Sequence, residues 1–279
     1  MNIDYGHEEQ PSREKEANIN AGRCSSCCSN IKDELKMQDM YSKSLPWSEN
    51  VIDYKACFSP GTATRNIRCI VFTVCMGTFV SDVFEDEARE YAIIYLTRWT
   101  ALVTYAFLLC SVICSAMPDK VENSDGSASL LAKVTWELAV LGMSVGSVVV
   151  IMFWVAIYKG GGNFYTIWNH GILFSICLLD ALGLGCIPVR MRQIRSVASF
   201  SIAYLCWSIF HSFSGIGNGV TWDDDSVEDD DAIYQVLSWK NSPGVALAYS
   251  AFVMIFLVPV TFLFIRQLSL LSQRKKFFK

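Results

Sequence analysis

The chain has 279 residues, of which 52% are hydrophobic and 18% are charged, and its formal net charge is -4. Long, nearly uncharged apolar runs recur along it, the first at 67–83 and the last at 245–265. About 20 apolar residues cross a bilayer core as a helix, whereas the helices of a soluble domain show a polar face at a 3.6-residue period. The pattern therefore excludes a water-soluble domain and indicates a polytopic membrane protein.

Residues 1–50 are rich in Asn, Glu, Ser and Lys and carry no sustained apolar period. Such a segment buries too little apolar surface to offset the entropy of ordering, so we predict a disordered cytoplasmic tail. Its Cys24, Cys27 and Cys28 fit either palmitoylation or half of a metal site. No second cysteine or histidine pair at ligand spacing accompanies them. We therefore expect no bound metal, and palmitoylation stays open.

Residues 51–270 are predicted to form an all-α bundle of six transmembrane helices, followed by a basic cytoplasmic tail at 271–279. The predicted spans are 67–84, 91–116, 134–158, 164–187, 197–216 and 245–265. Basic residues gather in alternate loops and in the tail, whereas the 217–244 loop carries two acidic runs. The positive-inside rule then predicts that both termini are cytoplasmic and that this loop lies on the opposite side.

The third span contains Gly142-Met143-Ser144-Val145-Gly146, which fits the G-x-S-x-G pattern of a serine hydrolase. That nucleophile elbow requires a sharp strand-to-helix turn, whereas this segment lies in the middle of an apolar helix. The same residues also read as Gly-x-x-x-Gly, which lets two helix backbones approach closely. We therefore predict that Gly142 and Gly146 lie at a helix contact and that Ser144 is not a nucleophile.

Polar residues within the spans are costly in lipid and normally face the interior of the bundle. The candidates are Thr97, Arg98, Asn169, His170, Asp180 and His211. At a rise of 1.5 Å per residue, Thr97 and His170 both lie about 9 Å from the same end of the bundle, and His211 approaches that layer. Asp180 lies about 15 Å deeper than His170 and cannot orient its ring. Arg98 needs a partner or a lipid head group.

A threonine hydroxyl becomes a nucleophile when an adjacent base accepts its proton, and histidine is the usual base near neutral pH. The pair Thr97 and His170 at a common depth therefore permits acyl transfer. The alternative stays open, because a membrane threonine usually bonds its own i−4 carbonyl and a buried histidine can simply link helices.

Several segments resemble motifs of one six-span family, which includes the androgen-induced and androgen-dependent membrane hydrolases and the rolling stone proteins. The first resemblance is Tyr95-Leu96-Thr97 followed by Trp99, and the second is Trp168-Asn169-His170-Gly171. The later ones are Asp180 with Pro188, Tyr204 to Trp207, and Tyr234 to Trp239. The later segments look closer to the rolling stone branch, and the order and spacing on six spans strengthen the match.

In the hydrolase branch, a threonine and a histidine at these places hydrolyse fatty acid esters of hydroxy fatty acids. The resemblance implies Thr97 as nucleophile and His170 as base, by analogy. The rolling stone branch is associated with membrane and cell-fusion roles and has no assigned reaction. Two further departures from the hydrolase pattern are Arg98, directly after the threonine, and the acidic insertion within 217–244.

Two functions are therefore carried forward. The first is a threonine hydrolase of lipid esters that needs no cofactor or metal and whose partners are the bilayer and a lipid ester. The second is a non-catalytic, rolling stone-like membrane protein that acts through protein partners of unknown identity. No nucleic acid partner is expected. Lys275 and Lys276 resemble the dilysine signal that retrieves proteins to the endoplasmic reticulum, but they lie one residue out of place for it. We therefore expect residence in the endoplasmic reticulum or the plasma membrane.

The orientation can be tested at Asp229, in the acidic loop. A cysteine introduced as Asp229→Cys should react with a membrane-impermeant maleimide from the non-cytoplasmic side only, because the alternating charge places this loop there. The unsubstituted protein, labelled in parallel, corrects for the native cysteines. Labelling of the new cysteine from the cytoplasmic side would reverse the topology and the depth assignments.

Overall fold

The computed structural model describes residues 44–45, 48–51, 53–59, 61–85, 89–158, 160, 163–217 and 232–277. Most of the predicted tail 1–50, the cysteine cluster at 24–28 and the acidic runs of the 217–244 loop lie outside these ranges. Before the first span, strands β1 (Ser44–Leu45) and β2 (Ser48–Val51) pair antiparallel. All other regular elements in the described ranges are helical.

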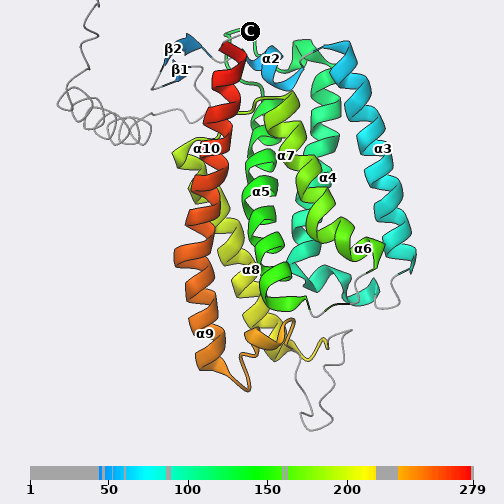
Figure 1. Cartoon of the computed structure of the whole chain (residues 1–279), viewed down its shortest axis with the longest axis vertical. Helices are drawn as coiled ribbons and strands as arrows, with labels where there is room; N and C mark the ends of the chain where they lie inside the picture. Colours follow the sequence, from blue (N-terminus) through cyan, green and yellow to red (C-terminus); the bar gives the residue numbers. More distant parts are fainter. Residues whose placement is uncertain are drawn as a thin grey trace, which may run out of the picture.

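Six helical segments of the described chain are long and apolar enough to cross a membrane, which confirms the predicted number of spans. They are Tyr54–Phe84, Leu96–Ala116, Leu130–Ile157, Phe164–Leu184, Met191–Ser214 and Pro243–Gln273. The segments lie side by side along the long axis of the bundle (Figure 1). These six helices indicate an integral membrane protein.

The first three spans consist mainly of single α-helices. They comprise α2 (Tyr54–Phe58) with α3 (Thr62–Glu85), then α4 (Leu96–Ala116), then α5 (Leu130–Met152) with the π-helical turn η3 (Phe153–Ile157). The second span begins five residues later than predicted, because η1 (Arg89–Ile94) is a 3₁₀ helix and Tyr95 is extended. The third begins earlier, at a Ser129 cap whose hydroxyl accepts from the Ala132 N–H. The 3₁₀ turn η2 (Pro118–Lys120) lies between α4 and α5.

The fourth and sixth spans contain π-helical turns, whereas the fifth begins with a 3₁₀ turn. The fourth comprises α6 (Phe164–Ile167), η4 (Trp168–Ile172), α7 (Leu173–Leu178) and η5 (Leu179–Leu184), of which η4 and η5 are π-helical. The fifth comprises the 3₁₀ turn η6 (Met191–Gln193) and α8 (Ile194–Ser214), which ends at Gly215 with a left-handed φ of 69°. The sixth, after the 3₁₀ turn η7 (Gln235–Leu237), comprises α9 (Pro243–Phe252), the π-helical η8 (Val253–Leu257) and α10 (Val258–Phe277).

Helix α5 is the centre of the bundle and contacts α4, α7, α8 and α10 (Figure 1). Its two glycines are the points of closest approach. A Cβ at Gly142 would lie 3.0 Å from the Cys177 sulfur and 3.3 Å from the Thr104 hydroxyl, and one at Gly146 would lie 2.9 Å from the Phe174 ring. The predicted helix-packing role of these glycines is confirmed.

Ser144, between the two glycines, does not lie in the setting of a nucleophile. Its side chain is fully buried within regular α-helix, and its hydroxyl has no hydrogen-bond partner among the described residues. The strand-to-helix turn of a nucleophile elbow is therefore missing at this position.

A buried ion pair joins the start of α3 to η5 at the end of the fourth span. The Arg68 Nε donates to the Asp180 carboxylate at 2.7 Å, and both side chains are nearly inaccessible. One guanidinium nitrogen also donates to the Phe58 carbonyl and the Ser115 hydroxyl. Arg68, near the start of α3, therefore holds α2, α3, α4 and η5 together.

The packing at Gly146 gives a first structural prediction. Gly146→Leu should lower the melting temperature in detergent by about 5 °C or more, because an overpacked core site costs about 1–3 kcal/mol. Gly77→Leu on α3 is the matched control, since Gly77 has no neighbouring atom within 4 Å of an added Cβ. Equal melting temperatures for the two variants would contradict the packing role.

Candidate functional site

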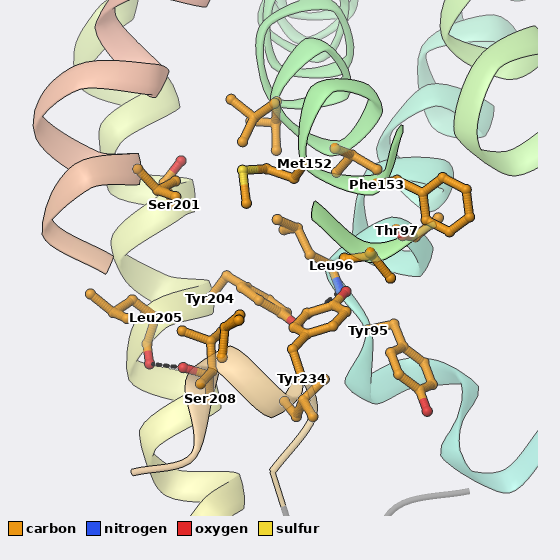
Figure 2. A pocket seen from close by; sticks show the side chains of 18 of the residues that line it. Tyr95, Leu96, Thr97, Met152, Phe153, Ser201, Tyr204, Leu205, Ser208 and Tyr234 are labelled. Atoms are coloured by element: carbon orange, nitrogen blue, oxygen red, sulfur yellow. Dashed lines mark hydrogen bonds between the residues drawn. The ribbon is translucent and has the colours of Figure 1, made fainter. Parts of the chain in front are cut away.

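A cavity of about 500 Å³ lies between the start of α4, the end of α5, the η4 region, α8, α9 and the segment around η7 (Figure 2). Most of its wall is aliphatic or aromatic. The aliphatic part includes Val145, Val148, Val149, Met152, Leu205 and Val253. Its volume falls within the range of about 300–1,000 Å³ that is typical of small-molecule sites. The cavity can therefore hold a largely apolar ligand.

Thr97 and His170 meet at the wall of this cavity. The Thr97 Oγ1 and the His170 Nε2 are 3.1 Å apart, within hydrogen-bonding distance, and both residues line the cavity. Thr97 is in the first turn of α4, and His170 is in η4 of the fourth span. The two side chains face one another as predicted, although they touch at the cavity wall and are not separated by the cavity, and their catalytic role stays a prediction.

Hydrogen bonding assigns the tautomer of His170. Its Nδ1 lies 2.9 Å from the Thr166 carbonyl oxygen, which can only accept, so Nδ1 carries the proton. In the neutral ring Nε2 is then unprotonated and accepts from the Thr97 hydroxyl. The Phe153 ring stacks on the imidazole with a centroid distance of 3.5 Å and an interplanar angle of 12°. Thr97, His170 and Thr166 form the chain of contacts expected of a nucleophile, a base and a group that orients the base.

Local structure explains why the ring is held so closely. Asn163 caps α6 by accepting from the Thr166 N–H, which fixes the turn whose carbonyl orients the imidazole. His170 lies in the π-helical turn η4, a distortion that is frequent at functional sites. The Trp154 indole donates to the His170 carbonyl at 2.8 Å. Both the backbone and the ring of His170 are thus fixed.

Arg98 has a protein partner and does not depend on a lipid head group. Its guanidinium pairs with the carboxylate of Asp82 on α3, and the Asn169 amide donates to the same oxygen at 3.0 Å. Asp82 is 5% exposed and was missed among the candidate polar residues. The signal was present, since Asp82 is the sole acidic residue of the predicted span 67–84. This network joins α3, α4 and η4 beside the Thr97–His170 pair.

Two tyrosines that the sequence identified only as family motif positions also reach the site. The Tyr204 hydroxyl of α8 accepts from the Leu96 N–H at 2.9 Å and donates to the Ile94 carbonyl at 3.0 Å. It therefore satisfies one of the free N–H groups at the start of α4. The Tyr234 hydroxyl lies close to Tyr204, the Leu96 N–H and Thr97. Figure 2 shows both rings converging on the start of α4.

Of the remaining candidates, Asp180 pairs with Arg68 far along the fourth span, as its depth implied. His211 does not join the pair. It is fully buried on α8 beside the Trp207 ring, at a centroid distance of 6.0 Å, and it is not part of the cavity wall. The described residues contain no group of three His, Cys, Asp or Glu side chains arranged to hold a metal.

No family model, curated protein or solved structure matches this chain. The resemblance to the androgen-induced, androgen-dependent and rolling stone proteins therefore stays a prediction from motifs.

The Arg98–Asp82 pair gives a prediction about stability. Asp82→Asn should cost about 3 kcal/mol, because it leaves a partly buried guanidinium without its counter-charge while Asn169 keeps an acceptor. The double variant Asp82→Asn with Arg98→Met should recover more than half of this loss, since no uncompensated charge remains. Thermal unfolding in detergent measures both. Equal losses in the single and double variants would show that an uncompensated Arg98 charge is not what destabilises the Asp82→Asn protein.

Proposed function

We propose that this chain is a membrane-embedded hydrolase of lipid esters, with Thr97 as nucleophile and His170 as general base. The observation that carries the proposal is the 3.1 Å contact between the Thr97 hydroxyl and the unprotonated nitrogen of His170 in the wall of an apolar cavity. We further propose membership of the androgen-induced, androgen-dependent and rolling stone family, closest to the rolling stone branch.

The first half-reaction follows from this geometry. The Thr97 Oγ1 bonds to the ester carbonyl carbon while its proton passes to His170 Nε2, and the carbonyl π electrons move onto oxygen. When that oxyanion collapses, the bond to the alcohol oxygen breaks, and the leaving alkoxide takes the proton from Nε2. The products of this step are the free hydroxy compound and an acyl group on Thr97.

The second half-reaction repeats the same steps with water. His170 Nε2 accepts a proton from a water molecule whose oxygen attacks the acyl carbon. The second oxyanion then collapses, and Thr97 leaves and recovers its proton from Nε2. The products are a fatty acid and the resting dyad. Each proton and electron pair is accounted for, so this mechanism needs no cofactor, metal or redox partner.

The cavity wall indicates the kind of ester. Its aliphatic and aromatic side chains suit acyl chains, while Thr97, His170 and the two tyrosines supply polar groups where the ester would react. An ester with apolar groups on both sides of the reacting bond matches this distribution. Fatty acid esters of hydroxy fatty acids have that character, and we propose them as the substrate class. The proposed setting is the endoplasmic reticulum or the plasma membrane, with cytoplasmic termini.

A second candidate function is favoured by the same contact. The Thr97–His170 hydrogen bond joins α4 to η4, and the Arg98–Asp82–Asn169 network joins α3 to both. In this alternative the polar residues only hold helices together, and the protein acts through protein partners, as a non-catalytic rolling stone-like protein. The two functions predict different effects of removing the Thr97 hydroxyl. The hydrolase would lose its ester hydrolysis, whereas the helix-linking protein would lose stability.

The dyad is tested by covalent labelling and by hydrolysis. Purified protein in detergent should react with a fluorophosphonate probe and cleave a fatty acid ester of a hydroxy fatty acid. Thr97→Ala should lower both rates by about 10³-fold or more, because the nucleophile is lost. His170→Ala should do the same, and Thr97→Ser should keep measurable activity.

The matched control is Thr100→Ala, one turn further along α4. The Thr100 hydroxyl donates to the Leu96 carbonyl of its own helix, and the residue does not line the cavity. If Thr97→Ala and Thr100→Ala show the same unchanged rates, Thr97 is not the nucleophile. If the wild-type protein neither labels nor hydrolyses, the helix-linking function is preferred.

A further inference from the structure

We infer that the Tyr234 hydroxyl donates the hydrogen bond that stabilises the oxyanion formed when Thr97 attacks the ester. This inference rests on the proposed hydrolase function and assigns a further catalytic residue to it. The mechanism requires such a donor, because the negative charge on the carbonyl oxygen develops in an apolar cavity. Preorganised donors at that oxygen often account for the largest part of an enzyme's rate enhancement.

The position of the Tyr234 hydroxyl supports the assignment. Tyr234 lines the same cavity as Thr97 and His170, and its hydroxyl lies close to Thr97 and to the Leu96 N–H (Figure 2). A donor beside the nucleophile is also beside the carbonyl oxygen once the nucleophile has bonded to the carbonyl carbon. His170 reaches Thr97 through its own Nε2, so the nucleophile has a base and a donor from different elements.

The Leu96 N–H and two side-chain donors close to Thr97 are already engaged. The Leu96 N–H donates to the Tyr204 hydroxyl, and the Tyr204 hydroxyl in turn donates to the Ile94 carbonyl. The Arg98 guanidinium pairs with Asp82. The Tyr234 hydroxyl is therefore a side-chain donor that can turn toward a new oxyanion without breaking one of these bonds.

Tyr234 is held in place by its neighbours, as an oxyanion donor must be. Its ring makes an edge contact with Tyr95 at a centroid distance of 6.0 Å. The adjacent Ile233 is 1% exposed and Leu237 is 8% exposed, so the segment is anchored on both sides of the tyrosine. The Trp239 indole donates to the Ser208 hydroxyl of α8 at 3.3 Å. The segment is thus fixed to the bundle by packing and by a hydrogen bond.

The protonation state also suits a donor. Burial raises the pKa of the Tyr234 phenol above its ordinary value, although the nearby hydroxyl and N–H groups of Tyr204, Leu96 and Thr97 oppose this. The phenol therefore keeps its proton near neutral pH. Its hydrogen bond to an oxyanion gains strength because the cavity wall is apolar and has a low local dielectric.

The test compares Tyr234→Phe with the wild-type enzyme. The variant keeps the ring and its packing and loses the hydroxyl. We expect kcat to fall by about 10²-fold or more, as when one oxyanion donor is removed, while KM changes by less than about threefold. The rate of fluorophosphonate labelling should fall in parallel, because the phosphoryl oxygen occupies the same position. Tyr105→Phe is the control, since Tyr105 is a buried tyrosine of α4 outside the cavity.

A second variant separates chemistry from folding. Replacing Tyr234 by 3,5-difluorotyrosine keeps the hydroxyl and makes it more acidic, so kcat should begin to fall at a lower alkaline pH than in the wild-type enzyme. The groups that face Tyr234 are Tyr95, Tyr204 of α8 and Tyr249 of α9, with Arg98 and His170 in the same cavity. They are unchanged in this variant, so a new alkaline decline belongs to residue 234.

The outcomes are distinguishable from those of the function itself. If Thr97→Ala is inactive while Tyr234→Phe and the fluorinated variant match the wild-type kcat and pH profile, the Tyr234 inference is overturned and the hydrolase function stands. If the wild-type protein neither hydrolyses nor labels, both are overturned. A kcat loss in Tyr234→Phe that Tyr105→Phe does not show, with KM retained, supports the assignment.

Discussion

The constraint on which this structure depends is the cost of a polar group in the apolar interior of a membrane bundle. Charged groups in particular need partners, because lipid offers none. Two buried ion pairs meet this requirement at separate places in the bundle, Arg68 with Asp180 and Arg98 with Asp82. Each pair joins α3 to another span, so the charges that are most costly to bury also determine how the first span is placed.

Close packing of α5 brings the two halves of the candidate site together. Gly142 is in contact with Thr104 of α4 and Cys177 of α7, and Gly146 is in contact with Phe174 of α7. These contacts hold α4 and the fourth span against one helix, a short distance along the chain from Thr97 and His170. The absence of two side chains on α5 therefore contributes to the 3.1 Å approach of hydroxyl and imidazole.

The site combines an apolar cavity with a few polar groups whose orientations are fixed. Backbone carbonyls direct two of them, with Thr166 orienting His170 and Ile94 accepting from Tyr204. The segment that supplies Tyr234 follows the acidic part of the 217–244 loop, so a connection between spans also forms a wall of the cavity. This arrangement suits an apolar ligand that places one polar group beside Thr97 and His170.

The sequence alone determined the number of spans, the glycine contact and the common depth of Thr97 and His170, because apolar length and a rise of 1.5 Å per residue fix position along a helix. Rotation about the helix axis is decided by packing. The pairing of Asp82 with Arg98, the burial of Arg68 against Asp180 and the position of His211 outside the cavity wall are therefore visible only in the tertiary structure. The tertiary structure alone placed Tyr234 and Thr97 in the wall of one cavity, because the proximity of residues 137 positions apart depends on how the later spans pack against the earlier ones.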